Sequence, residues 1–340
     1  MFRQENFFVT SMEKVFLGTR LNSDEIRQLM DGLLHSNLSD ARVAALLTAL
    51  RLSTITQELI LSSLESFKQS LKQFSGIDLS ETRVVDNSGT GGGQSATYNI
   101  SSMSAVLAAA AGACIAKFGS RSLSGHCGSA DVLESLGIPF AKKPEQFQRQ
   151  LKEVGISYLY APALIPPLQH INVVRRSLGF HTILDLLLPL ANPAPLYGQV
   201  LGVYSEDVQI LAARCLNALG RQRALVVHSE DGLDEISVSR PTRIVRLVDG
   251  HQSAEVWRPE DFGLKLYEKH ALVGGGMEEN TQCFRNVLAG HADGAVTDAV
   301  ILNAAATLWC AAVVDTVHDG VSLAQETLRS GRAEQKLEQW

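Results

Sequence analysis

The sequence is poor in aromatic residues and has no excess of basic charge. Aromatic side chains make up 6% of its 340 residues, and 36 acidic residues outnumber 30 Lys and Arg, which gives a net charge of −6. This balance offers no general electrostatic attraction to nucleic acid or to an anionic membrane, and we expect neither among its partners. Hydrophobic residues reach 45% and charged residues 19%, which is typical of a globular protein and excludes a disordered chain.

Long apolar segments and paired cysteines are also missing. The longest apolar runs, at residues 105–116 and 183–190, fall short of the about 20 residues that cross a bilayer. The N-terminal MFRQENFF is charged, and the apolar stretch of a signal peptide does not follow it. The five cysteines form neither CxxC pairs nor a metal-ligand spacing, so they are typical of reduced thiols. These absences predict a cytoplasmic protein.

Apolar periodicity divides the chain near residue 75. Residues 1–75 hold helical segments separated by polar turns, one of them opened by a capping-box pattern at residues 22–25, and we expect helices from about 166–190 to join this small domain. Residues 76–340 alternate strand-like and helical runs, which predicts βαβ units. Strands are expected at residues 82–86, 114–117, 157–160, 224–228 and 242–247, and helices at 102–113, 207–219 and 298–322. The predicted fold is α/β with a small α-helical N-terminal domain.

A glycine-rich loop follows the first of these strands. Residues 87–93 read Asn-Ser-Gly-Thr-Gly-Gly-Gly, and an apolar helical segment comes next. Consecutive glycines let backbone N–H groups point inward, and a helix N-terminus adds partial positive charge, so this order favours a phosphate or pyrophosphate. The loop is neither a Walker loop nor the dinucleotide fingerprint, because Gln94 occupies the third glycine position. A flexible surface turn is the alternative interpretation.

Two polar segments accompany the loop. Residues 99–102 (Asn-Ile-Ser-Ser) begin the following helix, where they would either cap it or hold Mg²⁺ and phosphate oxygens; capping is favoured when they are taken alone. Residues 117–125 end a strand with Lys117, Arg121 and three serines, which suits a second phosphate. A solvated surface loop is the alternative for that segment.

Two further charged positions stand out. Arg175 falls within the apolar stripe of a helix expected at residues 167–178, whereas Arg176 falls outside it. A guanidinium on a buried face needs an anionic partner, either a structural Asp or a ligand carboxylate. Asp234 and Glu235 follow a strand; two carboxylates there are either solvated or bind Mg²⁺ that bridges to a diphosphate.

Together these motifs resemble the anthranilate phosphoribosyltransferase family, from the N-terminal helices to about residue 320. The family's Gly-Thr-Gly-Gly-Asp corresponds to residues 89–93, its Asn-x-Ser-Thr to residues 99–102, and its Lys-His-Gly-Asn-Arg-Ser to residues 117–122. Residues 128–134, residues 192–194 and the Asp234-Glu235 pair match three further signatures. So many motifs in order, at unbroken spacing, are not expected from chance.

The resemblance implies a nucleoside phosphorylase/anthranilate phosphoribosyltransferase-like fold, a site at the hinge of the two domains, a homodimer formed through the helical domains, and a role in tryptophan biosynthesis. It implies phosphoribosyl pyrophosphate (PRPP) as donor, an aromatic acid as acceptor, and Mg²⁺ held by Ser101, Asp234 and Glu235. Lys117 and Arg121 would position the donor without acid–base catalysis, while Arg175 would bind the acceptor's carboxylate. The implied substrate-binding residues are Gly89, Thr90, Gly91, Gly92, Thr97, Asn99, Ser101, Ser102, Lys117, Ser120, Arg121, Ser122, Ser124, Gly125, Ser129 and Arg175.

Departures from the family pattern concentrate on the acceptor side. In the Lys-His-Gly-Asn-Arg-Ser segment, Phe118 and Ser120 replace the family's His and Asn. Ile165 replaces the His that precedes Pro-Ala, and Leu188 replaces a Gly. Gly93 replaces the Asp that ends the glycine loop. Arg175 alone remains of the usual acceptor contacts. We therefore hypothesise an acceptor that keeps its acid group and otherwise packs against apolar side chains, either anthranilate or an aromatic analogue.

Two other functions stay open. Residues 125–128 (Gly-His-Cys-Gly) resemble the Gly-His-Thr-Gly run of the pyrimidine nucleoside phosphorylases, which use phosphate and need no Asp-Glu metal pair. The second alternative is a non-catalytic relative that binds nucleic acid through a basic groove. The Asp234-Glu235 pair and the net charge of −6 argue against it.

Overall fold

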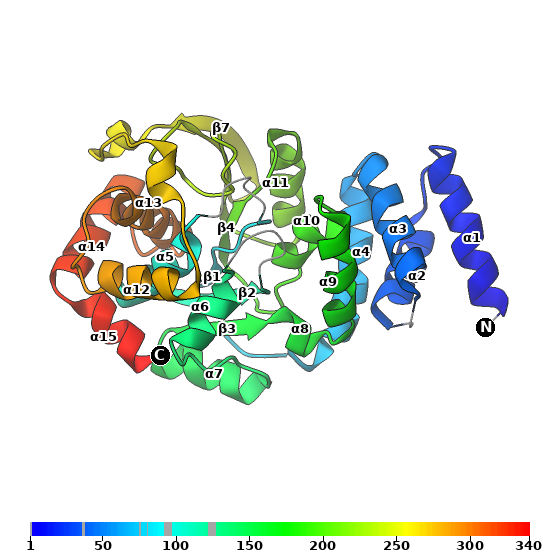
Figure 1. Cartoon of the computed structure of the whole chain (residues 1–340), viewed down its shortest axis with the longest axis horizontal. Coiled ribbons are helices and arrows are strands. Elements are labelled where there is room, and N and C mark those ends of the chain that lie inside the picture. Colours follow the sequence, from blue (N-terminus) through cyan, green and yellow to red (C-terminus); the bar gives the residue numbers. More distant parts are fainter. Residues whose placement is uncertain (1, 36–37, 75, 80, 92–96, 122–126) are drawn as a thin grey trace. The chain divides into compact units, whose positions relative to one another are not determined.

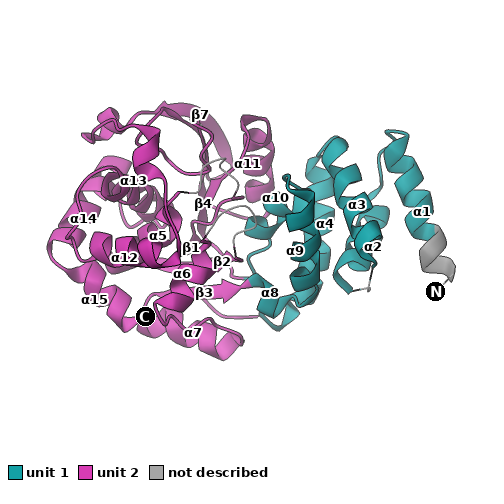
Figure 2. Cartoon of the chain, viewed as in Figure 1, with its two compact units in different colours: residues 1–75, 161–193 teal, residues 76–160, 194–340 magenta. Residues whose placement is uncertain are grey.

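Two parts of the chain fold as separate units (Figure 2). Unit 1 comprises residues 1–75 and 161–193, and unit 2 comprises residues 76–160 and 194–340. The computed structural model describes residues 2–35, 38–74, 76–79, 81–91, 97–121 and 127–340, with side chains from residue 7 onward. In this part of the chain, no helix is long and apolar enough to cross a membrane.

All secondary-structure elements in the described residues of unit 1 are helices. Its elements are α1 (Phe2–Phe16), α2 (Ser23–His35), α3 (Asp40–Leu52), α4 (Gln57–Ser70), the 3-10 turn η1 (Lys72–Phe74), α8 (Ala161–Leu164), α9 (Pro167–Leu178) and α10 (Ile183–Leu190). The predicted capping box is present, because the Glu25 N–H donates to Asn22 Oδ1 and the Asn22 N–H donates to Glu25 Oε2, both at 3.0 Å. Helix α2 packs on α4, α3 on α9, and α10 on α4, so the later segment completes the core of the earlier one.

Unit 2 is built on a seven-stranded sheet with the order β3-β2-β1-β4-β5-β6-β7. Its strands are β1 (Val84–Asp86), β2 (Cys114–Gly119), β3 (Ile156–Tyr160), β4 (Gly198–Gly202), β5 (Arg223–Ser229), β6 (Thr242–Val248) and β7 (His251–Trp257). The strands from β3 to β5 pair in parallel, whereas β6 and β7 are antiparallel. The chain leaves β1 toward β2 and β3, then returns to place β4 on the other side of β1. A topological switch point therefore lies between β1 and β4.

Helices cover this sheet on both faces (Figure 1). Those of unit 2 are α5 (Ile100–Ala110), α6 (Ser129–Ser135), α7 (Pro144–Glu153), α11 (Gln209–Ala218), α12 (Met277–Leu288), α13 (Ala295–Cys310), α14 (Val317–Arg329) and α15 (Arg332–Gln339), with 3-10 turns η2 (Glu206–Val208), η3 (Pro259–Phe262) and η4 (Lys269–Leu272). Helix α13 is apolar on all sides and packs on α5, α14, β1, β4 and β5, as expected of a central, buried helix. Helix α11 packs on β5 and β6.

These observations confirm the predicted α/β fold with a helical N-terminal part, but one predicted helix is wrong. Residues 298–322 form two helices, because α13 ends at Cys310 and α14 begins at Val317. The chain turns at Ala312, which has a left-handed φ of 52°, and Thr316 caps the new helix by accepting the Asp319 N–H at 3.1 Å. The strands β4 and β7 were not predicted.

Candidate active site

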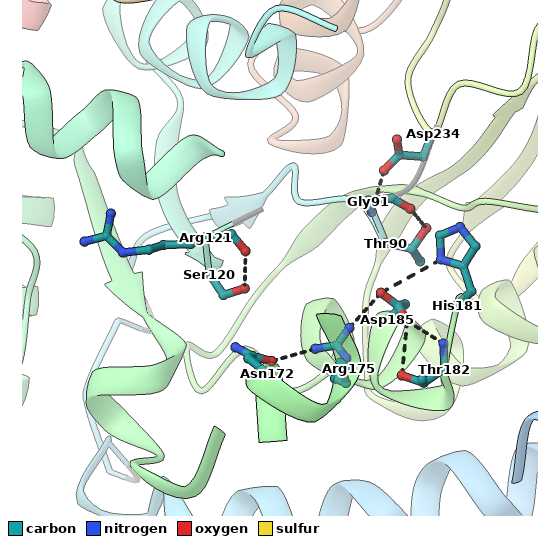
Figure 3. A network of polar contacts seen from close by, with 10 residues as sticks. All are labelled: Thr90, Gly91, Ser120, Arg121, Asn172, Arg175, His181, Thr182, Asp185 and Asp234. Atoms are coloured by element: carbon teal, nitrogen blue, oxygen red, sulfur yellow. Dashed lines mark hydrogen bonds and ion pairs between the residues drawn. The ribbon is translucent and has the colours of Figure 1, made fainter. Parts of the chain in front are cut away.

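The switch point between β1 and β4 brings together two loops distant in sequence. The Thr90 N–H donates to the Gly202 carbonyl oxygen at 2.9 Å, which ties the loop after β1 to the end of β4. The Gly91 N–H donates to Asp234 Oδ2 at 2.8 Å, as Figure 3 shows. Because ligands of open α/β sheets bind outside the carboxyl ends of the strands at such a point, this crevice is the candidate site.

Two glycines make this close approach possible. A Cβ atom on Gly202 would overlap the carbonyl oxygen of Asp234, and one on Gly89 would overlap the Asp234 carboxylate. Since Gly is the one residue that leaves this space empty, the backbone of the Asp234 loop lies directly on the ends of β1 and β4.

A buried lysine joins the ends of β1 and β2 to the start of α5. Lys117 is 3% exposed, and its Nζ donates to Asn87 Oδ1 at 3.0 Å. Asn87 Nδ2 in turn donates to the Ser101 carbonyl oxygen at 2.8 Å and to Ser104 Oγ at 3.1 Å. Burial lowers the pKa of Lys117, while the charges of Asp86, Glu235 and Asp234 oppose that shift. The ammonium thus belongs to the same electrostatic cluster as the acidic pair.

The first turn of α5 presents polar atoms without protein partners. Asn99 is the N-cap residue of α5, but its side chain makes no capping bond; its Nδ2 donates to the Cys127 carbonyl oxygen at 3.3 Å, and its buried Oδ1 has no hydrogen-bond partner in the described part of the chain. The buried Ser102 Oγ likewise has none there. The side-chain capping that residues 99–102 favoured is therefore wrong at the N-cap position. Buried polar atoms of this kind call for a further partner.

The acidic pair lies beside this helix start. The Ser101 N–H donates to Glu235 Oε1 at 3.1 Å, whereas Glu235 Oε2 is enclosed and finds no hydrogen-bond partner within the described ranges. Burial and the neighbouring charge of Asp234 raise the pKa of Glu235 to about 8, against the opposing effects of the Ser101 N–H and Lys117. The two carboxylates therefore repel each other in an enclosed position.

This donor set fits a divalent cation with oxygen ligands. A hard cation would neutralise the pair and satisfy the orphaned Glu235 Oε2. In the described ranges, no group of three or more His, Cys, Asp and Glu side chains gathers as a complete metal site. Water and ligand oxygens would have to complete the coordination, which is typical of Mg²⁺.

Arg121 is engaged elsewhere in the structure. Its Nη2 donates to Glu134 Oε2 at 2.6 Å and its Nη1 to Asp131 Oδ1, both on α6, and its guanidinium lies 5.8 Å from the centroid of the Tyr160 ring. The hydrogen bonds to these carboxylates raise the pKa of Arg121. The pairing with α6 was not visible in the sequence, and the described residues of the β1–β4 crevice make no hydrogen bond or ion pair with Arg121.

The remaining predicted contacts of unit 2 divide into two groups. Ser120 Oγ donates to the Arg121 carbonyl oxygen at 3.0 Å, Thr97 forms an isolated bridge with Val273, and Ser129 is the first residue of α6. Gly92, Gly93, Ser122, Ser124 and Gly125 lie outside the described residues.

Arg175 forms a separate cluster within unit 1. It is 4% exposed on α9, and its Nη2 donates to Asp185 Oδ1 at 2.7 Å and its Nη1 to Asn172 Oδ1 at 2.9 Å (Figure 3). The buried Nε has no hydrogen-bond partner among the described side chains and backbone groups. The predicted buried position is confirmed, and Arg176 is exposed as expected. Of the two partners that the sequence left open, the structure contains the structural Asp.

Two of the residues that replace the family's polar groups are buried. Phe118 and Ile165 are each 1% exposed, Phe118 on β2 next to Lys117 and Ile165 after α8. Leu188 on α10 is partly buried. Phe118 and Ile165 therefore pack inside their own units.

Comparison with known proteins assigns this architecture to a class. Residues 81–334 match the model of the glycosyl transferase family a/b domain, and residues 10–70 match that of its helical bundle domain. The chain is thus a glycosyltransferase of the helical-bundle and α/β type.

Individual relatives narrow the class. An anthranilate phosphoribosyltransferase of Desulfosudis oleivorans is 38% identical over 332 residues, which is 98% of this chain and 97% of the relative. The crystal structure of the enzyme of that name from Thermus thermophilus has a TM-score of 0.86 and 36% identity, covering 96% of this chain and 97% of that one. The chain belongs to the anthranilate phosphoribosyltransferase family and is a phosphoribosyltransferase. A yeast structure titled anthranilate phosphoribosyltransferase in complex with PRPP and Mg shares the fold, with a TM-score of 0.87 at 23% identity over 98% of this chain and 97% of that one.

Sequence reasoning missed two residues of the crevice. Asn87 connects Lys117 with Ser101, and its place directly after the strand could have indicated this role. Gly202 ends β4, a strand whose glycine-bounded sequence gave no strong signal.

Proposed function

We propose that this protein transfers the phosphoribosyl group of PRPP to the amino nitrogen of an aromatic acid, either anthranilate or an analogue, with Mg²⁺ and with release of pyrophosphate. The names of the relatives support the reaction, and the yeast complex with PRPP and Mg supports the donor and the metal. The observation that carries the proposal is the convergence of the glycine loop, the start of α5 and the Asp234-Glu235 pair at the β1–β4 switch point.

The residues of the crevice suit the donor's charge. Lys117, the glycine-loop residues Gly89 to Gly92 and the side chains of Asn99 and Ser102 would hold phosphate oxygens, joined by Thr90 and Thr97. The Thr90 and Gly91 N–H groups must then leave the Gly202 carbonyl oxygen and the Asp234 carboxylate. Ser120, Arg121, Ser122, Ser124, Gly125 and Ser129 would hold the second phosphate; Arg121 must then leave at least one of its carboxylate partners on α6. Each of these contacts positions the donor, because none of the residues acts as an acid or base.

Ser101, Asp234 and Glu235 would hold the metal. Bound Mg²⁺ supplies charge stabilisation for the departing pyrophosphate. The bond from the ribose carbon to the pyrophosphate oxygen would break, the ribose carbon would become oxocarbenium-like, and the acceptor nitrogen would form the new C–N bond and release its proton to solvent. Lys117 and the N–H groups of the glycine loop would stabilise the negative charge that grows on pyrophosphate.

The acceptor would make few polar contacts with the protein. The Arg175 Nε donor has no hydrogen-bond partner among the residues that the structure describes and is the candidate for the acceptor's carboxylate. Phe118 and Ile165 replace the family's His with apolar side chains that pack inside their own units, so the acceptor would lose two polar contacts, and an acceptor with fewer polar substituents than usual fits this chain.

The experiment combines the purified protein with PRPP, Mg²⁺ and a panel of aromatic amino acids that includes anthranilate and its para isomer. Release of pyrophosphate that requires both an amino acid and Mg²⁺ is the expected result. Phosphate-dependent cleavage of thymidine or uridine that persists in chelator would instead favour the nucleoside phosphorylase alternative. Fast turnover of anthranilate at a micromolar KM would refute the altered acceptor preference while leaving the reaction class intact.

We also propose a homodimer formed through unit 1. Large apolar side chains are exposed on this unit, including Leu52 at 84%, Leu17 at 78% and Phe16 at 65%. Large apolar side chains exposed to this degree favour an interface with a partner. Light scattering should give a mass near twice that of the 36.8 kDa chain, and Phe16→Ser with Leu17→Ser should lower it.

A further inference from the structure

The Asp234-Glu235 pair lies in a loop between β5 and β6, yet one side chain of α13 holds this loop. Asn303 Oδ1 accepts the Ile236 N–H at 3.1 Å, and Asn303 Nδ2 donates to the Ile236 carbonyl oxygen at 2.8 Å. Ile236 directly follows Glu235 in the chain. A single amide thus satisfies both backbone groups of the residue next to the acidic pair, in the way that a neighbouring strand would.

The Asn303 side chain is fixed in turn. It is 5% exposed in an otherwise apolar stretch of α13, and its Nδ2 also donates to the Ala299 carbonyl oxygen at 2.9 Å. A buried amide is unfavourable unless it is hydrogen-bonded, and here both of its N–H groups and its oxygen are used. Helix α13 packs on β1, β4 and β5. The hydrogen bonds of Asn303 therefore fix the position of the loop relative to the strands that form the crevice.

Other contacts hold the loop that contains the acidic pair less directly. Leu233 and Ile236, which flank the pair, are 2% and 1% exposed. The Asp231 carboxylate accepts the hydroxyls of Ser237, at 2.7 Å, and Ser239. These contacts close the loop on itself, whereas Asn303 alone among the described side chains bonds to both backbone groups of Ile236 from outside the loop.

We propose that Asn303 is a positioning residue for the metal: by clamping Ile236 it sets where the Glu235 carboxylate lies relative to the start of α5 and to Asp234. The inference rests on the proposed function, since it takes Asp234 and Glu235 as the metal's ligands. Partners that orient metal ligands typically change metal affinity by about 10- to 100-fold when they are removed. The same range is expected for Asn303.

The test measures metal affinity directly. Mn²⁺ is titrated into the protein with PRPP present and acceptor absent, and free Mn²⁺ is followed by electron paramagnetic resonance. Asn303→Ala is expected to weaken Mn²⁺ binding about 10- to 100-fold. PRPP affinity without metal should stay within about twofold, and kcat should recover at saturating Mn²⁺, which a merely structural role of Asn303 would not produce.

Thr307→Val is the matched control. Thr307 Oγ1 donates to the Asn303 carbonyl oxygen at 2.8 Å, so the variant removes a buried hydrogen bond from the same helix without touching the loop. Its Mn²⁺ affinity should equal that of the unmodified protein, and an equal loss would overturn the proposal in favour of general loosening of α13. If Asn303→Ala does not fold, Asn303→Ser keeps a small polar group on the helix and is expected to show the same loss.

The outcomes separate the two proposals. Unchanged Mn²⁺ affinity in a folded Asn303 variant overturns the positioning role, while the proposed function stands. Failure of the unmodified protein to bind Mn²⁺ in the presence of PRPP contradicts the proposed function itself, and with it the role of Asn303.

Discussion

The β1–β4 crevice of unit 2 and the Arg175 cluster of unit 1 differ in how their ionisable groups are paired. In the crevice, Asp234 and Glu235 are neighbours in the chain, and Glu235 Oε2 has no hydrogen-bond partner among the described residues. In unit 1, the Arg175 guanidinium faces Asp185 at 2.7 Å, and a neighbouring Asn accepts a second of its N–H groups. The first arrangement places two carboxyl groups next to each other, whereas the second is an ion pair within the chain.

Because of this difference, the crevice is evidence for a ligand, whereas the Arg175 cluster alone is not. Repelling carboxylates and orphaned polar atoms are unfavourable in the free protein, so they point to a ligand that relieves them. A buried ion pair supports the fold whether or not a ligand binds. The crevice therefore favours the proposed binding of donor and metal, whereas an experiment must decide whether Arg175 recognises the acceptor or only supports the fold.

Removing the acidic pair should have the largest effect. Asp234→Ala with Glu235→Ala is expected to lower Mg²⁺-dependent turnover by about 10³-fold or more, since several kcal/mol of charge stabilisation are lost. Because burial and Asp234 raise the pKa of Glu235 to about 8, removing the pair should leave the metal-free stability at pH 8 unchanged or higher. Turnover and thermal unfolding without metal measure the two effects.

Glu230→Ala serves as the control for the acidic pair. Glu230 is an exposed carboxylate of the same loop, paired with Arg243 at 3.6 Å. Its removal should change turnover by less than about twofold, as expected of a surface ion pair. If the double variant kept full Mg²⁺-dependent activity, Asp234 and Glu235 could not be the metal's ligands and the contrast between the two regions would disappear.

Filling the space at Gly202 should have the next largest effect. The Cβ of Gly202→Ala would overlap the Asp234 carbonyl oxygen, so the loop must move away from β4. We expect about a 10²-fold loss of Mg²⁺-dependent turnover, comparable to the loss of a ligand-orienting contact. Gly32→Ala on α2 is the control, because nothing lies within 4 Å of its added Cβ, and it should be neutral or slightly stabilising. Normal activity of Gly202→Ala would show that the loop tolerates displacement.

Local features of both regions could be predicted from the sequence. The strand, glycine loop and helix are neighbours in the chain, and the buried stripe that contains Arg175 follows from helical periodicity, which the burial of Leu168, Ile171 and Val174 confirms. The break between α13 and α14 escaped prediction because neither Gly nor Pro marks it, and a left-handed Ala312 makes the turn.

Long-range pairings could not be predicted. The strand order places β4 beside β1 although more than 100 residues separate them, and only tertiary packing decides that neighbour. The same holds for the side-chain partners: Arg121 pairs with α6, Arg175 with Asp185 across a turn, and Asn303 with a loop 67 residues away. The sequence identifies the polar residues, whereas the fold determines which of them meet.

Replacing Arg175 tests whether its cluster also recognises the acceptor. Arg175→Ala is expected to raise the acceptor's KM by about 10-fold, the loss of one charge-assisted hydrogen bond, with the donor's KM within about twofold. Asp185→Asn keeps the guanidinium and should leave the acceptor's KM nearly unchanged while lowering stability. If Arg175→Ala lost stability alone, with the acceptor's KM unaltered, the cluster would be structural; a rise in the donor's KM would show that Arg175 contacts the other substrate.

The pH dependence of stability gives the smallest effect and tests the neutralised pair directly. Burial alone would raise the pKa of Asp185, but the hydrogen bond with His181, the Arg175 charge and the Thr182 N–H together hold that pKa below its ordinary value. A carboxyl group with a lowered pKa in the folded state stabilises the fold above its ordinary pKa, and this contribution is lost as the pH falls. The difference in unfolding free energy between the unmodified protein and Asp185→Asn should therefore be largest at pH 7 and shrink by about 1 kcal/mol at pH 3, within the usual range for one substitution. Urea unfolding at both pH values measures it, and a difference that grew on acidification would mean that Arg175 does not hold Asp185 in its charged form.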